Sequence, residues 1–215
     1  MNNEDIKIIN NFLDKEVFKK LQSFLLGNEF AWFYNKKKID YIKNPFFRTE
    51  DAGRSPITPI KGYEADDTHQ FTHSFFQKQM NWSNASINIA PLLDKINPRV
   101  WIKVKGNLSS INSKPLVGGW HCDKDTDGKA WTDTTTSIFF INTNNGHTLF
   151  ENGKKVPSVE NTLVTFPNNT LHTGVSQTDT KTRVTLNLNY LGGQRKRKKQ
   201  STNCVRSILT KRMPN

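Results

Sequence analysis

The spacing of hydrophobic residues along the chain changes once, near residue 99. Before that point one segment has the three- and four-residue spacing of an amphipathic helix. Asp14 precedes this segment as a suitable N-cap, and Gly27 follows it as a suitable C-cap. The apolar positions of this predicted helix are Val17, Phe18, Leu21, Phe24 and Leu25.

Two further segments of the first half have apolar spacings that we interpret as short helices. They are DDTHQFTHSFFQ (66–77) and SINIAPLLDKIN (86–97). Residues 28–66 contain many aromatic, lysine, proline and glycine residues and have no clear period, so they predict irregular structure.

From Arg99 onward the apolar residues alternate with polar ones, which predicts strands. Turn signals separate these strands, namely Asn145-Gly146, Asn152-Gly153, Pro167-Asn168-Asn169 and Thr178-Asp179. Eight short strands after helices predict a mainly β protein with supporting helices, in which the strands form a jelly-roll barrel, or double-stranded β-helix. The predicted strands are VWIKVKGNL, GWHCD, TTTSIFFIN, HTLFE, KKV, TLVTF, LHTGV and RVTLNLNY.

The length of 215 residues and the hydrophobic content of 34% suit one sizeable core. We expect one domain over residues 1–193, with helical support in 1–98 and the jelly-roll core in 99–193. No apolar run approaches the roughly 20 residues that span a bilayer, and the first ten residues are too polar for a secretory signal. Cys122 and Cys204 are two isolated cysteines, which suit a reducing compartment. We therefore expect a cytoplasmic protein without a membrane segment.

Positive charge is concentrated at the end of the chain. The formal net charge is +12, and residues 194–215 hold eight lysines and arginines with no acidic residue. This segment has few apolar residues, so we expect a flexible basic tail. The tail suits non-specific contact with nucleic acid or with an acidic protein surface, and the alternative is a solubilising tail without a partner.

The stretch WHCDKDTDGKAW (120–131) fits two kinds of metal site. Asp123, Asp125, Asp127 and Gly128 match the start of a calcium-binding loop. The twelfth loop position would need a glutamate but is Thr134, and β-favouring residues follow it, so the pattern disfavours calcium. The same stretch contains His-x-Asp, which is half of a two-histidine, one-carboxylate iron site.

A third ligand of that iron site is available 49 residues beyond Asp123, in FPNNTLHTGV. His172 opens a predicted strand after a tight turn, where the rim of a barrel can direct an imidazole toward a distant strand. Two neutral imidazoles and one carboxylate leave three coordination positions open, as non-haem Fe(II) chemistry with oxygen requires.

The strand RVTLNLNY has one polar and one apolar face. Alternation places Arg183, Thr185, Asn187 and Asn189 together, and Val184, Leu186, Leu188 and Tyr190 opposite. An arginine inside a barrel needs a counter-charge, so this face suits an anionic ligand such as a carboxylate. The alternative is that Arg183 faces solvent while the leucines fill the core.

His121-x-Asp123, His172 and Arg183, in this order and on these strands, resemble the 2-oxoglutarate and Fe(II)-dependent oxygenases. The resemblance is particularly to the prolyl-4-hydroxylase-like branch and its short phage-encoded relatives. The similarity covers roughly residues 99–191, including IKVKGNL, GGWHCD, IFFINTNNGHTLFENG and LHTG, and extends to the amino-terminal helices.

The resemblance implies that His121, Asp123 and His172 hold Fe(II) and that 2-oxoglutarate chelates the metal. It implies that Arg183 binds the far carboxylate of 2-oxoglutarate, with Thr185 beside it. Asn107 is a candidate for the near carboxylate, with a purely structural role equally open.

One departure from the resemblance concerns an aromatic hydroxyl. Prolyl hydroxylases often supply such a hydroxyl to the far carboxylate from the strand after His-x-Asp. This strand has Phe139 and Phe140 instead, which cannot donate a hydrogen bond.

The activity implied by the resemblance is hydroxylation of a C–H bond with O2, while 2-oxoglutarate is converted to succinate and carbon dioxide. The expected substrate is a peptide or protein side chain such as proline, in the host cytoplasm if the chain is phage-encoded. Two alternatives are oxidative demethylation or hydroxylation of nucleic acid, suggested by the basic tail, and a non-catalytic jelly-roll binding or structural module.

Other histidines and aromatic residues have plainer interpretations. We expect His69 and His73 to be a surface pair, and His147 to be an ordinary strand residue. The thiol of Cys122 should point away from the metal because it alternates with both neighbours. The run Trp32 to Tyr34 could line a substrate groove, although packing of the helices on the barrel is favoured.

Overall fold

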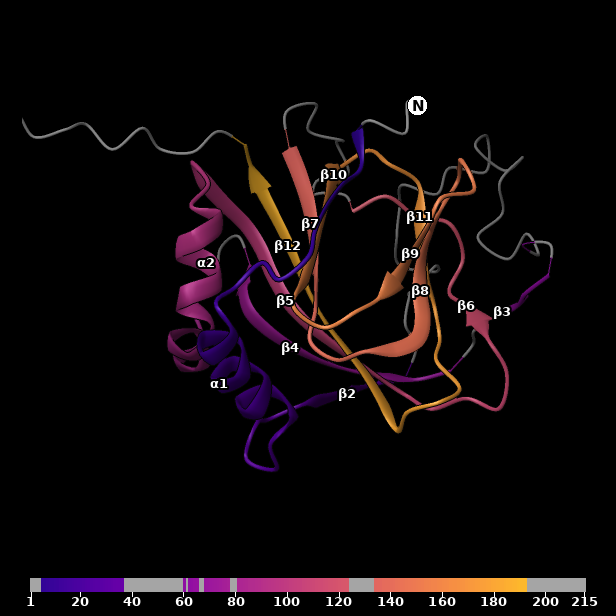
Figure 1. The fold of residues 1–215 in the computed structure, drawn as a ribbon, viewed down its shortest axis with the longest axis horizontal. Coiled ribbons are helices and arrows are strands. Elements are labelled where there is room, and N and C mark those ends of the chain that lie inside the picture. The colour runs from indigo at the N-terminus through magenta and orange to yellow at the C-terminus, as the bar shows by residue number, and fades with distance from the viewer. Residues whose placement is uncertain are drawn as a thin grey trace, which may run out of the picture.

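The computed structural model consists of two facing β-sheets with helices on one outer side (Figure 1). It describes residues 5–36, 60, 62–65, 68–77, 81–123 and 134–192. The larger sheet contains, in spatial order, β1 (Lys7–Ile9), β10 (Thr162–Pro167), β7 (Thr134–Phe140), β12 (Thr182–Leu191), β5 (Val100–Ser110), β4 (Gln70–Gln77) and β2 (Phe33–Asn35). The smaller sheet contains β3 (Glu64–Ala65), β6 (Leu116–Val117), β11 (His172–Val175), β8 (Asn144–Phe150) and β9 (Lys155–Ser158).

The order of the strands confirms the mainly β, jelly-roll prediction. Neighbouring strands are antiparallel except for β3 and β6, and strands distant in the sequence lie side by side, such as β12 between β7 and β5. Within the described residues, no helix has the length and apolar character needed to cross a membrane.

The first predicted helix is present as α1 (Lys15–Leu26). The Asp14 carboxylate accepts a hydrogen bond from the backbone N–H of Glu16, and the Gly27 N–H donates to the carbonyl of Phe24, as expected of the two caps. The buried face of α1 packs on the larger sheet, where the rings of Phe18 and Phe139 meet edge to face. This contact fixes the helix against the outer side of the barrel.

The alternation predicted for RVTLNLNY is also present. In β12 the side chains of Val184, Leu186, Leu188 and Tyr190 belong to the hydrophobic core under the helices. The opposite face of β12, which begins with Arg183, is directed between the two sheets. Thus β12 separates an apolar layer from a polar interior.

The helix predicted over 66–77 is wrong, because β4 occupies Gln70–Gln77. A spacing of four residues, as between Phe71 and Phe75, places two side chains on one face of a helix and also on one face of a strand. Pairing with β2 and β5 decides in favour of the strand. The predicted helix over 86–97 is confirmed, as a 3-10 turn at Asn84–Ile89 followed by α2 (Ala90–Ile96).

Two local predictions in the barrel are also wrong. Asn145-Gly146 is not a turn but lies inside β8 at an irregularity in its pairing with β9, where the Asn144 side chain accepts a hydrogen bond from the Gly146 N–H. The segment GWHCD is not a continuous strand and pairs only at His121. By contrast, Asn152-Gly153 forms a turn, with Gly153 at a φ of 84°.

Candidate metal centre and its pocket

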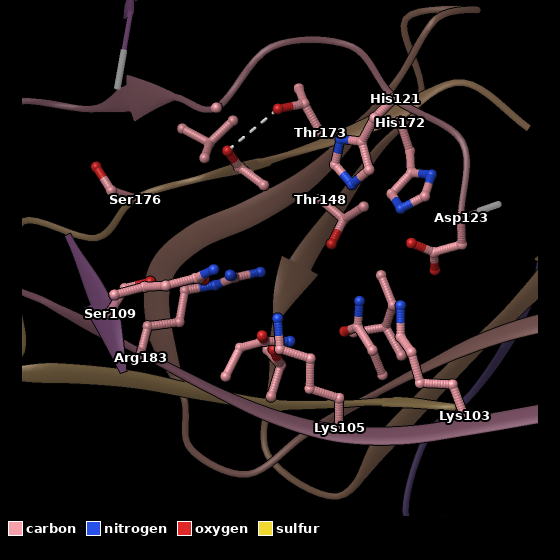
Figure 2. A pocket seen from close by; sticks show the side chains of 18 residues that line it. Lys103, Lys105, Ser109, His121, Asp123, Thr148, His172, Thr173, Ser176 and Arg183 are labelled. Atoms are coloured by element: carbon pink, nitrogen blue, oxygen red, sulfur yellow. Dashed lines mark hydrogen bonds between the residues drawn. The ribbon is translucent and has the colours of Figure 1, made fainter. Parts of the chain in front are cut away.

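A pocket of about 250 Å³ lies between the two sheets, and all six predicted site residues line it (Figure 2). Their side chains come from both sheets and from the segment after β6. The structure thus brings together residues that are up to 78 positions apart in the sequence. They are Asn107, His121, Asp123, His172, Arg183 and Thr185.

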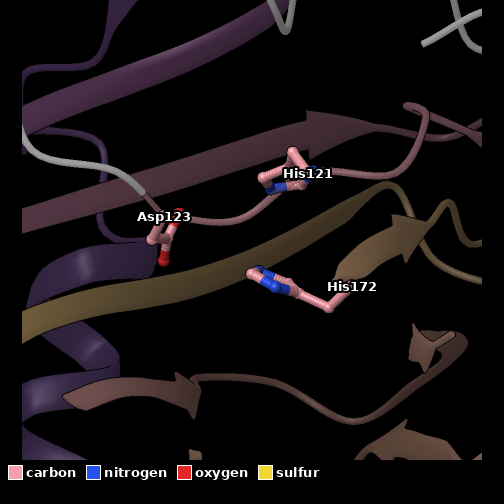
Figure 3. A group of neighbouring side chains, drawn as sticks. All are labelled: His121, Asp123 and His172. Atoms are coloured by element: carbon pink, nitrogen blue, oxygen red, sulfur yellow. The ribbon is translucent and has the colours of Figure 1, made fainter. Parts of the chain in front are cut away.

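His121 and His172 face each other across a single β-bridge. Each backbone N–H donates to the other residue's carbonyl, at 3.1 Å from His121 and 3.0 Å from His172. The bridge brings the imidazole rings to a centroid separation of 4.6 Å, with Asp123 beside them (Figure 3). Candidate ligand atoms of the three residues all lie within 4.8 Å of one another.

Backbone carbonyls orient both imidazoles. The Nδ1 atom of His172 lies 3.0 Å from the Thr170 carbonyl oxygen, and that of His121 lies 3.2 Å from the Gly119 oxygen. Because a carbonyl only accepts, each Nδ1 carries the proton and each Nε2 keeps a free lone pair. The Nε2 atom of His172 is buried and has no hydrogen-bond partner.

The Asp123 carboxylate is held in place by Asn189, whose side-chain N–H donates to Oδ2 at 3.1 Å. Asn189 also donates to the hydroxyl of Thr136 at 3.0 Å, so its amide is fixed from two sides. Burial alone would raise the pKa of Asp123, but the neighbouring His172, Lys103 and His121 and the hydrogen bond from Asn189 outweigh burial and hold that pKa below its usual range. The carboxylate is therefore ionised at neutral pH.

His172 is buried beneath an aromatic wall formed by Phe150 and Phe166. The centroids of these rings lie 6.2 Å and 4.8 Å, respectively, from the centroid of the imidazole. Burial lowers the pKa of His172 to about 4, so the ring is neutral near pH 7. One carboxylate and two imidazoles are the donor set of a non-haem Fe(II) site, and the unpartnered Nε2 of His172 fits a metal ligand.

Arg183 occupies the part of the pocket away from this triad. Its Nε–H donates to the Ser158 hydroxyl at 2.8 Å, and its guanidinium lies 5.7 Å from the centre of the Phe140 ring. Burial lowers the pKa of Arg183 to about 10, which leaves it charged at neutral pH. A buried cation with a polar pocket in front of it suits an anionic ligand.

Gly146 makes space for the Arg183 side chain. A Cβ atom at Gly146 would lie 3.0 Å from Arg183 Cδ and 2.9 Å from the Val175 carbonyl oxygen. A Cβ atom at Gly174 would meet the guanidinium at an ordinary 3.6 Å. The irregularity in β8 that the sequence suggested as a turn therefore serves to let Arg183 enter the pocket.

Thr185 and Asn107 are direct partners in the pairing of β12 with β5 and lie next to each other in the pocket floor. In the same pairing Arg183 lies opposite Ser109, and Asn189 lies opposite Lys103. The floor therefore runs from the guanidinium at one end to the Asp123 support at the other.

Three contributors to the site were missed from the sequence. Lys103 and Lys105 line the pocket from β5, and Ser158 contacts Arg183 from β9. Asn189 was placed on the polar face of β12, but its contact with Asp123 was not predicted. The alternation in VWIKVKGNL, which puts its two lysines on the same face as Asn107, could have identified the first two.

In solved structures, the fold recurs in an oxidoreductase of the 2OG-Fe(II) oxygenase family from Burkholderia pseudomallei. The two chains share 11% sequence identity and superpose with a TM-score of 0.56, over 90% of this chain and 89% of the other. This chain has the fold of a 2OG-Fe(II) oxygenase. The oxygenase fold also matches the non-heme alpha ketoglutarate dependent epimerase SnoN from nogalamycin biosynthesis, with a TM-score of 0.51 and 12% identity over 87% of this chain and 76% of that one.

A prolyl-4-hydroxylase from Pseudomonas putida superposes on the same oxygenase fold with a TM-score of 0.48 and 10% identity, over 88% of this chain and 93% of that chain. No family model matches the sequence, and no curated protein matches it. The two structures that superpose with TM-scores of 0.56 and 0.51 confirm the resemblance at the level of the fold.

The remaining histidines do not join the site. The prediction that His73 lies on the surface is wrong, because His73 is buried. Its Nδ1 is close to the Ala31 carbonyl, and its Nε2 is close to the Ser83 hydroxyl. The reason is that residues 70–77 form a strand, and the face of that strand that carries His73 and Phe75 packs against the helices. His147 lies on β8, as predicted, and its Nε2 is 3.0 Å from the Tyr63 hydroxyl.

The thiol of Cys122 lies 3.2 Å from the Asn169 carbonyl oxygen, outside the residues that line the pocket. Trp32 packs against the core, as favoured, whereas Phe33 and Tyr34 are more than half exposed. Asp125, Asp127 and Gly128 of the calcium-type pattern lie outside the described residues, as does the basic tail.

Proposed function

We propose that this protein is a 2-oxoglutarate and Fe(II)-dependent oxygenase that hydroxylates a C–H bond. The reaction consumes the substrate, O2 and 2-oxoglutarate, and it yields the hydroxylated product, succinate and carbon dioxide. The observation that carries the proposal is the buried, unpartnered Nε2 of His172, which faces a second imidazole and an ionised carboxylate. Buried polar atoms without a partner are rare unless a ligand satisfies them.

Each part of the pocket has a distinct role in this proposal. His121, Asp123 and His172 would hold Fe(II), which supplies activation of O2 when bound. Asn189 keeps the Asp123 carboxylate oriented toward the metal position. The aromatic wall around His172 excludes water from that side of the metal position.

The cosubstrate would lie along the pocket floor, between the metal end and Arg183. The guanidinium would bind the far carboxylate of 2-oxoglutarate in a charge-assisted contact, with Thr185 as its helper. Asn107, the cross-strand partner of Thr185, would be the candidate for the near carboxylate. The Ser158 hydroxyl accepts from Arg183 and so keeps its own O–H available as a donor. We propose that this hydroxyl takes the place of the aromatic hydroxyl that Phe139 and Phe140 cannot provide.

The substrate would be a peptide or protein side chain, with proline the first to test. The protein would act in the cytoplasm, of a host cell if the chain is phage-encoded, and its basic tail 194–215 would make non-specific contacts with nucleic acid. The domain would comprise residues 1–193. Truncation after Gly193 should then weaken binding to nucleic acid and leave metal binding unchanged, because every proposed ligand precedes the cut.

Metal and cosubstrate binding test the proposal directly. Anaerobically purified protein should bind one Fe(II) per chain, or Mn(II) or Co(II) as inert substitutes, and calorimetry should then detect 2-oxoglutarate binding only to the metal-loaded protein. Exposure of the iron complex to O2 should release succinate. His121→Ala and His172→Ala should each abolish high-affinity metal binding, whereas Asp125→Ala and Asp127→Ala should not.

Undiminished metal affinity in both histidine variants would refute the assignment. Loss of the ion in the Asp125 and Asp127 variants instead would indicate a calcium loop. A protein that binds neither metal nor 2-oxoglutarate would be a non-catalytic jelly-roll module.

A further inference from the structure

The pocket contains more positive charge than the proposed cofactors require. Lys103, Lys105 and Arg183 all line it, whereas Asp123 is the one acidic residue among its described lining. In Figure 2 the two lysine side chains extend from β5 into the pocket, Lys103 toward Asp123 and Lys105 between Lys103 and Arg183.

Pairing between β5 and β12 determines where these amines lie. Lys103 is opposite Asn189, which supports Asp123, and Lys105 is opposite Asn187. Both lysines are therefore nearer to the metal end of the floor than Asn107 is. Neither forms an ion pair or a side-chain hydrogen bond with another residue in the part of the chain that the structure describes.

Two amines held beside a metal site repel each other and the metal. Burial, followed by the charge of Lys103, lowers the pKa of Lys105 to about 8, so the ammonium form is still present at neutral pH. The two charges of 2-oxoglutarate balance those of a divalent metal. The three cationic side chains then still face a single carboxylate, and an excess of two positive charges remains unless another anion enters.

We propose that Lys103 and Lys105 bind an acidic group of the substrate, a carboxylate or phosphate on a single side chain or a small organic acid. This inference rests on the proposed oxygenase function and changes its substrate class from proline to an acidic side chain or small acid. The lysines would act as specificity-determining residues, anchoring the acidic group so that a neighbouring C–H bond lies at the metal end. A pocket of about 250 Å³ that must also hold 2-oxoglutarate has room for one such group inside it.

Matched acid and amide compounds test this proposal. The probes are the N-acetyl amides of aspartate, glutamate and phosphoserine, each paired with its uncharged counterpart from asparagine, glutamine or serine. Calorimetry would measure their binding to the anaerobic Mn(II)·2-oxoglutarate complex of the wild type, Lys103→Met and Lys105→Met. We expect at least one acidic probe to bind better than its neutral partner, and each lysine variant to weaken that binding about 10- to 100-fold.

Two controls separate charge from position. Lys20→Met removes one positive charge from the exposed face of α1 and should leave acidic-probe binding within about two-fold of wild type. The affinity for 2-oxoglutarate should stay within about three-fold in Lys103→Met and Lys105→Met, because Arg183 binds its far carboxylate.

Several results would overturn the inference. One is equal binding of the acidic and neutral probes, or binding of none. Another is a loss of 2-oxoglutarate affinity in the lysine variants as large as in Arg183→Gln, which would assign the lysines to the cosubstrate. The inference would also be overturned if the lysines were needed to bind a single-stranded oligonucleotide but not to bind any acidic probe. Absence of the Mn(II)·2-oxoglutarate complex in the wild type would instead refute the oxygenase function itself.

Discussion

Asn189 on β12 donates a hydrogen bond to Oδ2 of Asp123 at 3.1 Å and so connects the pocket floor to the metal triad. If Asp123 is a ligand, loss of this bond should loosen its orientation. We expect Asn189→Ala to weaken Fe(II) or Mn(II) binding about 10- to 100-fold, as is usual when a partner of a metal ligand is removed. Asn187→Ala is the matched control, since Asn187 lines the same floor two residues away without contacting the triad. Calorimetric titration with Mn(II) measures both, and equal losses would contradict the assigned role.

Arg183 should control the affinity for 2-oxoglutarate without affecting the metal. A charge-assisted contact is worth about 1.5–3 kcal/mol, so Arg183→Gln should weaken 2-oxoglutarate binding about 10- to 100-fold. Arg183→Lys should restore only part of this, because an ammonium cannot form the paired contacts of a guanidinium. Ser158→Ala, which removes the acceptor for Nε, should have a smaller effect of about three- to ten-fold. Unchanged 2-oxoglutarate affinity in Arg183→Gln would mean that another cation holds the cosubstrate.

Gly146 should be required for the position of Arg183. In Gly146→Ala the new methyl group would lie 3.0 Å from Arg183 Cδ and 2.9 Å from both Asn144 Oδ1 and the Val175 carbonyl oxygen, so β8 or its neighbours must shift and the space for the arginine is lost. We expect weaker 2-oxoglutarate binding, by about ten-fold or more, with metal affinity preserved. Gly174→Ala places its methyl group 3.6 Å from the same guanidinium and should bind 2-oxoglutarate nearly as well as wild type. Similar affinities in the two variants would show that Gly146 does not position the arginine.

Patterns confined to one segment predicted much of this site. The alternation in RVTLNLNY was sufficient to separate Arg183 from the leucines, because a strand between two layers repeats every two residues whatever its partners are. The His-x-Asp dyad and His172 were recognisable because their residue types limit the chemistry available to them. The capping residues of α1 were recognisable because they form hydrogen bonds with backbone groups of their own helix, and these bonds depend on no distant segment.

What the sequence did not show depends on contacts between distant segments. The spacing of Phe71 and Phe75 fits a helix and a strand equally, and only pairing with β2 and β5 makes it a strand. The alternation in VWIKVKGNL places the lysines of β5 on the same face as Asn107, but that face lines a pocket only because the smaller sheet covers it. Ser158 and Arg183 are 25 positions apart on different sheets, so no local pattern relates them.

The buried imidazole of His172 should make the stability of the metal-free protein depend on pH. Its pKa is lowered to about 4 in the folded protein, from 6.5 for an ordinary histidine, chiefly by burial. Above pH 6.5 the ring is neutral in both the folded and unfolded states, so it imposes no cost. Between pH 6.5 and 4 the unfolded state binds a proton that the folded state does not, and stability falls by up to about 1.4 kcal/mol per pH unit.

Urea unfolding of the chelator-treated protein should therefore show a free energy of unfolding that declines as the pH is lowered from 6.5 to 4. His172→Gln removes the titrating group and should flatten much of this decline. A smaller slope should remain, because burial and the charge of Lys155 also lower the pKa of His147. His147→Gln is the matched comparison and should flatten the decline less, because its imidazole is less deeply buried. An equally steep decline in His172→Gln and wild type would mean that His172 is already protonated in the folded protein, and the free Nε2 lone pair assigned to the metal would then be absent at acidic pH.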